Sequence, residues 1–100
     1  MSARYRITPR AFKDLKAIAH YSLANWGVLQ RDAYLDDLEQ RFTWLAENPQ
    51  AGKQRTDVCD GYRSYLQGAH IIFYIVREDV IDIIGVPHQS MDIEGYFEQD

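Results

Sequence analysis

Cysteine is almost absent from this chain of 100 residues, which contains a single one, Cys59. One cysteine cannot form a disulfide within the chain, so its cysteine content gives no indication of an oxidising compartment. Long apolar runs are also missing, because the longest, 71–76, is far shorter than the roughly 20 residues that cross a bilayer. The N-terminal residues carry no apolar secretory stretch. These absences predict a soluble, cytoplasmic domain that makes no contact with a membrane.

Motifs for metals, cofactors and covalent catalysis are equally scarce. The sequence has no CxxC, HExxH or glycine-rich phosphate loop, and its three histidines, His20, His70 and His88, are far apart. Cys59 lies in a polar segment without an activating motif, which indicates an inert thiol. We therefore predict no metal site, no cofactor and no catalytic residue of these kinds.

The charges are unevenly distributed along the chain, whose net charge is −4. Residues 1–27 hold five Lys and Arg against one Asp, whereas residues 68–100 hold one Arg against seven Asp and Glu. An acidic protein is poorly suited to bind DNA directly by neutralising its phosphates. The acidic residues Asp36, Asp37 and Glu39 are predicted to form the solvated face of a helix.

Two amphipathic helices are predicted in the first half. Thr8-Pro9 is typical of an N-cap followed by Pro at the first helical position, and Gly27 is a natural stop, so the first helix spans about 9–26. The second helix begins directly afterwards and ends at Asn48-Pro49, which predicts an antiparallel hairpin. Their apolar stripes have helical spacing and comprise Phe12, Leu15, Ala19, Ser22 and Trp26 in the first helix, and Leu35, Leu38, Phe42 and Leu45 in the second.

Strands are predicted elsewhere. Tyr5-Arg6-Ile7 is suited to a short first strand, residues 50–60 are predicted to be a surface loop, and three strands follow, ending in an irregular polar tail. The runs at 71–76 and 80–84 are rich in Ile, Val, Phe and Tyr, which favours an antiparallel sheet. The order β-α-α-β-β-β predicts one α+β domain over 1–100, with the hairpin on one face of the sheet and the first strand at the edge or against the last strand.

A cationic group offers one catalytic hypothesis. Lys53, Arg55 and Arg63 could converge on an anion, and His88 follows the last strand, so together they could hold an RNA phosphate and move a proton. The alternative is that Lys53 and Arg55 are solvated and that Arg63 pairs with a carboxylate such as Asp82.

Large aromatic side chains exceed what one small core can hide. Trp44 lies off the apolar stripe of the second helix, and the large aromatic residues cannot all be central; these are Phe12, Tyr21, Tyr34, Phe42, Trp44, Tyr62 and Tyr65. We predict that some of them border an exposed apolar groove that binds a partner, and we choose Tyr34, Trp44, Tyr62 and Tyr65 as the partner contacts.

Ordered motifs over residues 4–92 resemble the ParE toxins of the ParE/RelE superfamily. The resemblance rests on Tyr5-Arg6-Ile7-Thr8-Pro9-Arg10-Ala11, Asp14-Leu15, Tyr21, Trp26-Gly27, Tyr34-Leu35-Asp36-Asp37-Leu38, Leu45-Ala46-Glu47-Asn48-Pro49, Gly52, Tyr62-Arg63-Ser64, Ile72-Phe73-Tyr74, His88-Gln89 and Met91-Asp92. It implies the toxin half of a bacterial type II toxin–antitoxin pair. ParE-like members inhibit DNA gyrase, whereas RelE-like members cleave mRNA on the ribosome.

The resemblance also implies partners and site residues. It implies a ParD-type antitoxin that forms a hetero-oligomer with this chain, and the aromatic residues Tyr34, Trp44, Tyr62 and Tyr65 chosen above are the expected contacts for it. It also implies gyrase as the target, for which Arg63, His88, Met91 and Asp92 are the expected contacts. The acidic C-terminal third favours the gyrase branch, because it would repel mRNA. Two alternatives stay open: an mRNA endonuclease that uses Lys53, Arg55, Arg63 and His88, and a degenerate, non-toxic member that binds only its antitoxin.

Overall fold

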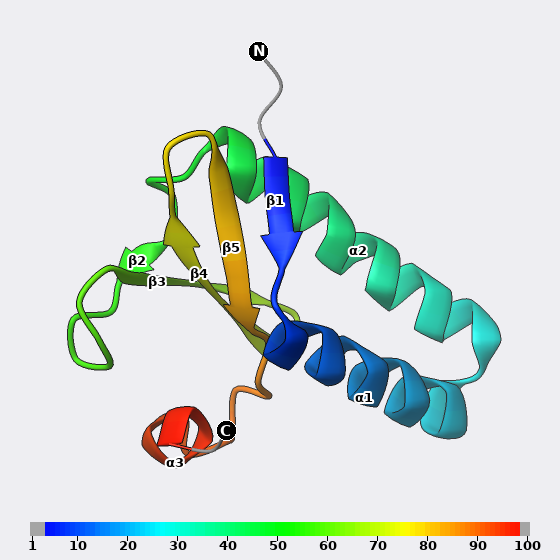
Figure 1. Ribbon diagram of the computed structural model, residues 1–100. Helices are drawn as coiled ribbons and strands as arrows, with labels where there is room; N and C mark the ends of the chain where they lie inside the picture. The colour runs from blue at the N-terminus through cyan, green and yellow to red at the C-terminus, as the bar shows by residue number, and fades with distance from the viewer. Residues whose placement is uncertain (1–3, 99–100) are drawn as a thin grey trace.

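The computed structural model describes residues 4–98, which form five strands and three helices (Figure 1). The two long helices lie on one side of the sheet, and the short third helix lies apart from them near the C-terminus (Figure 1). In chain order the elements are β1 (Arg4–Ile7), α1 (Pro9–Trp26), α2 (Val28–Glu47), β2 (Lys53–Gln54), β3 (Tyr62–Gln67), β4 (His70–Val76), β5 (Val80–Gly85) and α3 (Ile93–Glu98).

The sheet has the strand order β1-β5-β4-β3-β2. β1 pairs with β5 in parallel, while the other neighbours are antiparallel. This confirms the predicted α+β class and places β1 both at the edge and beside the last strand. Side chains alternate between the faces of a strand, so Arg63, opposite Tyr74, and Ser64, opposite Phe73, leave β3 on different faces.

The helical hairpin follows the expected start and stop signals. The Thr8 hydroxyl accepts a hydrogen bond from the Ala11 N–H at 3.3 Å, and Pro9 occupies the first turn of α1. Gly27 ends α1 with φ 89°, a left-handed conformation that favours glycine, and α2 starts at the next residue. Among residues 4–98, no helix is long and apolar enough to span a membrane.

The core lies between the hairpin and the sheet. Each large apolar side chain buried there stabilises the fold by roughly 1.5–3 kcal/mol, which holds the hairpin on this face. The buried side chains at this interface are Ala11 and Ile18 of α1, Leu38, Phe42 and Leu45 of α2, Ile72 and Tyr74 of β4, and Ile81 and Ile83 of β5.

Two elements differ from the sequence prediction. The predicted surface loop 50–60 contains β2, a strand of only two residues that pairs Lys53 with Ser64. The predicted irregular tail contains α3, whose Ile93, Tyr96 and Phe97 have helical spacing. Both elements are too short to produce a repeating apolar pattern, so periodicity could not reveal them.

Candidate functional site: a groove beside the helical hairpin

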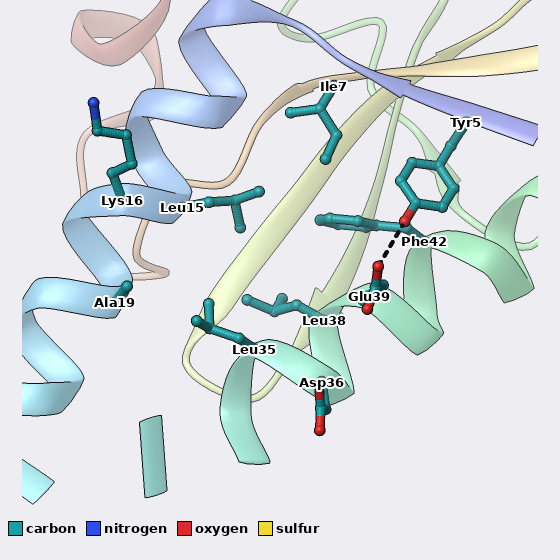
Figure 2. Close-up of a pocket in the computed structure, with 10 residues that line it drawn as sticks. All are labelled: Tyr5, Ile7, Leu15, Lys16, Ala19, Leu35, Asp36, Leu38, Glu39 and Phe42. Atoms are coloured by element: carbon teal, nitrogen blue, oxygen red, sulfur yellow. Dashed lines mark hydrogen bonds between the residues drawn. The ribbon is translucent and has the colours of Figure 1, made fainter. Parts of the chain in front are cut away.

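A groove of about 330 Å³ lies between β1 and the two long helices (Figure 2). Its floor is apolar, because it is built from the edges of the α1 and α2 stripes and from the side chains of β1 that face the helices. The lining residues are Tyr5 and Ile7 of β1, Leu15, Lys16 and Ala19 of α1, and Leu35, Asp36, Leu38, Glu39 and Phe42 of α2.

One polar contact spans the groove. The Tyr5 hydroxyl donates a long hydrogen bond of 3.4 Å to the Glu39 carboxylate (Figure 2). Partial burial raises the pKa of the Tyr5 phenol, and the nearby Glu39 charge adds to the rise. Tyr5 also packs edge-on against Phe42, with ring centroids 5.4 Å apart. Tyr5 therefore joins the edge strand to α2 while its ring forms part of the groove wall.

Apolar surface continues from the groove toward the turn of the hairpin. Leu15, Ala19, Leu23 and Trp26 are spaced by four, four and three residues, so they follow one flank of α1. Trp26 is 67% exposed, and Leu29, at the start of α2, is 86% exposed. The segment 17–30 contains no Lys, Arg, Asp or Glu. Contiguous exposed apolar surface of this kind makes the flank a candidate contact region.

The aromatic residues predicted to bind a partner lie elsewhere. Trp44 and Tyr65 pack together with ring centroids 5.4 Å apart, and the Arg41 guanidinium lies over both rings at 4.8 and 4.9 Å. Tyr62 is on the other face of the sheet, against Phe97 of α3, at 5.3 Å. The structure thus brings Trp44 and Tyr65 together on the β3 side of α2, at the opposite edge of the sheet from the groove, and separates Tyr62 from them.

Tyr34 is hydrogen-bonded to His70, whose ring in turn packs against His88. Its hydroxyl lies 2.6 Å from His70 Nδ1 and accepts the Ala69 N–H at 3.1 Å. The His70 and His88 rings meet edge-on with centroids 5.3 Å apart, and His88 Nδ1 accepts the Ser90 N–H at 3.1 Å. Burial and the neighbouring His88 lower the pKa of His70. Backbone pairing of residue 70 with 88 therefore brings together two histidines that are distant in the sequence.

Arg63 binds the chain that follows α2. Its guanidinium donates to the Gly52 carbonyl at 2.7 Å and to the Gln50 side-chain oxygen at 2.8 Å. The predicted pairing of Arg63 with Asp82 is wrong, because the two residues leave the sheet on opposite faces. Asp82 is instead bound by Arg6 at 2.8 Å and Arg77 at 3.0 Å.

Lys53 and Arg55 do not join Arg63. Lys53 pairs with Ser64, and Arg55 donates to the Ser64 hydroxyl at 3.1 Å, so both residues are on the face of the sheet away from the hairpin. Arg55 also makes two hydrogen bonds to the Asp57 carboxylate, at 3.0 and 3.1 Å, and these lower the pKa of Asp57. Arg55 is therefore paired within the chain. The alternative given in the sequence analysis, that Arg55 is solvated, is wrong.

His88 is equally remote from Arg63. His88 lies beside His70, whereas Arg63 lies opposite Tyr74. His70 and Tyr74 are four residues apart on β4, which corresponds to roughly 13 Å at about 3.4 Å per residue. Within residues 4–98 the four members of the predicted nuclease set therefore do not face a single point. Those residues also contain no group of three or more His, Cys, Asp or Glu side chains that could hold a metal ion.

α3 covers part of the open face of the sheet. Phe97 packs against Phe73, at 5.0 Å between ring centroids, and the Tyr96 hydroxyl donates a short hydrogen bond to the Asp14 carboxylate of α1. Burial, followed by the Asp14 contact, raises the pKa of Tyr96. Asp92 accepts the Gly95 N–H at 3.3 Å at the start of α3. Of the predicted target contacts in this segment, Met91 is exposed and Asp92 also caps the helix.

Sequence comparison identifies the family. A family model described as "ParE toxin of type II toxin-antitoxin system, parDE" matches residues 5–93. The chain belongs to the ParE toxin family. This confirms the resemblance seen in the sequence motifs.

Individual ParE relatives match almost end to end. Toxin ParE1 of Mycobacterium tuberculosis is 36% identical over 95 residues, which cover 94% of this chain and 97% of the relative. Toxin ParE1 of Caulobacter vibrioides is 38% identical over 92 residues, which cover 92% and 95%. A solved structure of the "Chromosomal ParDE TA system from P. aeruginosa" has a TM-score of 0.72 at 18% identity, covering 85% of this chain and 94% of that one. At that identity the likeness confirms the fold.

The sequence analysis predicted an apolar groove but missed its position between β1 and the two long helices. Leu15 and Leu35, which line the groove, were assigned only to the apolar stripes of the helices. Periodicity tells which residues share a helix face, but it cannot tell which of them the neighbouring strand leaves uncovered. A usable signal is the charge-free segment 17–30 in a chain with 26% charged residues.

Proposed function

We propose that this ParE-family chain acts in the cytoplasm as a toxin that inhibits DNA gyrase by protein–protein contact, and that a ParD-type antitoxin neutralises it. The family assignment carries the proposal, since the matching model describes a toxin of a type II toxin–antitoxin system. The structural neighbour from P. aeruginosa is itself a ParDE system, which supports an antitoxin partner of the same kind here.

Dispersal of the cationic residues supports inhibition by contact over RNA cleavage. A nuclease needs its phosphate clamp and its proton-transfer group around one reacting atom. Arg63 is bound to Gln50 and Gly52, Arg55 is bound to Asp57, and His88 is held by Ser90 at the other end of β4. The mRNA endonuclease therefore remains the second candidate, and a non-toxic member that binds only its antitoxin remains the third.

The groove supports the antitoxin part of the proposal. Its apolar floor suits an amphipathic helix, and β1 has no strand partner on its outer side within the described residues. A disordered antitoxin tail could fold into the groove and pair with that edge, so that a large area is buried. Trp44, Tyr34 and Tyr65 remain proposed contacts for a tail that crosses α2, and Tyr62 for one that reaches the open face.

The target-facing surface is proposed on the segment after β5. His88 and Met91 are exposed there, and Asp92 lies next to them at the start of α3. Arg63 is proposed as a separate contact, because it lies roughly 13 Å along the sheet from His88. A target that touches both must extend along the strands from one to the other.

Induction of the chain in bacteria tests the proposal. We expect growth arrest, filamentation and a DNA-damage response, all abolished when the product of the adjacent reading frame is co-expressed. Transcript ends should be unchanged in wild type and in Arg63→Ala. Codon-positioned cleavage that Arg63→Ala removes would support the nuclease instead, and normal growth of the induced strain would support the non-toxic member.

A further inference from the structure

The two helical walls of the groove carry opposite charges. Lys16 stands on the α1 wall, whereas Asp36 and Glu39 stand on the α2 wall (Figure 2). None of the three forms an ion pair within residues 4–98, where the ion pairs join Arg6, Arg31, Arg55 and Arg77 to carboxylates outside the groove. Lys16 lies over the Phe12 ring at 5.6 Å, and the one hydrogen bond that the Glu39 carboxylate accepts within the described part of the chain is the long one from Tyr5. The charges are thus available to an occupant.

The apolar strip along the groove flank of α1, which runs from Phe12 through Leu15, Ala19 and Leu23 to Trp26, sets the length of that occupant. Phe12 and Trp26 are fourteen residues apart, which corresponds to roughly 21 Å at 1.5 Å per residue. A partner helix of about fourteen residues would cover this length. Its apolar stripe would lie on Leu15, Ala19 and Leu35, and its two flanks would face the two charged walls.

We propose that the charges on these walls select the partner. The groove accepts an antitoxin helix that carries Lys or Arg on the flank facing Asp36 and Glu39, and Asp or Glu on the flank facing Lys16. The inference rests on the antitoxin partner proposed above. A helix laid in the reverse direction would meet like charges on both walls. Such juxtaposition discriminates between partners more strongly than it raises affinity.

The test measures binding of the full-length product of the adjacent reading frame to charge-reversal variants. Asp36→Lys, Glu39→Lys and Lys16→Glu should each raise the dissociation constant by about tenfold at 50 mM salt, and the difference should shrink at 500 mM salt. Glu47→Lys and Lys13→Glu are the matched controls, because each makes the same charge change on the same helix at an exposed position outside the groove. The controls should stay within about twofold of wild type.

A compensating exchange completes the test. A Lys→Glu or Arg→Glu substitution on the basic flank of the partner helix should restore tight binding to Glu39→Lys and weaken binding to wild type. Thermal unfolding of each variant checks that the fold is retained, and Glu39→Gln keeps a hydrogen-bond acceptor for Tyr5. If wall and control variants bind the partner equally well, selection by the wall charges is wrong, while the proposal of an antitoxin partner is unaffected. If wild type binds no product of the adjacent frame, both proposals are wrong.

Discussion

The hydroxyl of Tyr74 accepts the Gly52 N–H at 2.8 Å, and it also donates to the Pro49 carbonyl at 2.9 Å. One buried side chain of β4 thereby fixes the chain that leaves α2. A Cβ at Gly52 would overlap the Tyr74 ring, so glycine is required for this approach. Arg63 binds the same segment through the Gly52 carbonyl.

Removing that hydroxyl should destabilise the fold. Tyr74→Phe leaves a buried N–H and a carbonyl without their partner, which costs about 1–3 kcal/mol of unfolding free energy. Urea denaturation followed by circular dichroism measures the loss. Tyr21→Phe is the control, since Tyr21 is exposed and should change stability by less than about 0.5 kcal/mol. Equal stability of Tyr74→Phe and wild type would show that the clamp contributes nothing.

Stability should fall between pH 7.5 and 5.5 because of His70. Its ring faces Tyr34 from α2, His88 from the segment after β5, and the more distant charge of Asp14 from α1. Since burial and His88 hold the pKa of His70 below the usual value of about 6.5, the unfolded chain binds the proton first as the pH falls. The contribution of His70 is thus fully present above that value and decreases below it. His70→Gln should flatten the dependence of the unfolding free energy on pH, whereas the control His20→Gln should keep the dependence of the wild type. Equal slopes in the wild type and both variants would contradict the assignment to His70.

Gly85 and Tyr96 should be energetically coupled. A Cβ at Gly85 would overlap the Tyr96 hydroxyl, which is held by Asp14. Gly85→Ala should therefore lower the free energy of unfolding of the wild type by about 1–3 kcal/mol through overpacking, and it should lower that of Tyr96→Ala clearly less. A double-mutant cycle by urea denaturation gives the coupling energy. A value near zero would mean that α3 does not pack against β5 in solution.

Tryptophan fluorescence should report occupation of the groove. Trp26 is 67% exposed at the end of the apolar strip, whereas Trp44 is half-buried beside Tyr65 and Arg41. Binding of the adjacent-frame product should shift the emission to shorter wavelength, and most of that shift should be lost in Trp26→Phe. Persistence of the full shift in Trp26→Phe, with its loss in Trp44→Phe, would place the antitoxin on the β3 side of α2 instead.

The sequence predicted the hairpin and the three long strands because each carries its own local signal. Thr8-Pro9, Gly27 and Asn48-Pro49 mark the helix ends, and the apolar spacing marks their faces. Features set by pairing between distant segments could not be predicted in this way. The approach of His70 to His88 and the opposite faces of Arg63 and Asp82 both follow from strand register, which no local pattern determines.

The site was harder to predict than the fold for a related physical reason. Lys53, Arg55 and Arg63 are neighbours in sequence, and sequence proximity suggested convergence. The two-residue period of β3 and its pairing with β2 instead distribute them over two faces. Leu35 and Phe42 were expected in the core, and Phe42 is buried there, whereas Leu35 is only partly buried and lines the groove.

ATP-dependent supercoiling of relaxed plasmid by purified DNA gyrase tests the central claim most directly. The wild-type protein should inhibit supercoiling at concentrations comparable to that of gyrase, and a stoichiometric amount of the adjacent-frame product should restore it. The same preparation should leave mRNA intact in a translating extract. Unchanged supercoiling at a large excess of the protein, together with cleavage of mRNA in that extract, would contradict the account.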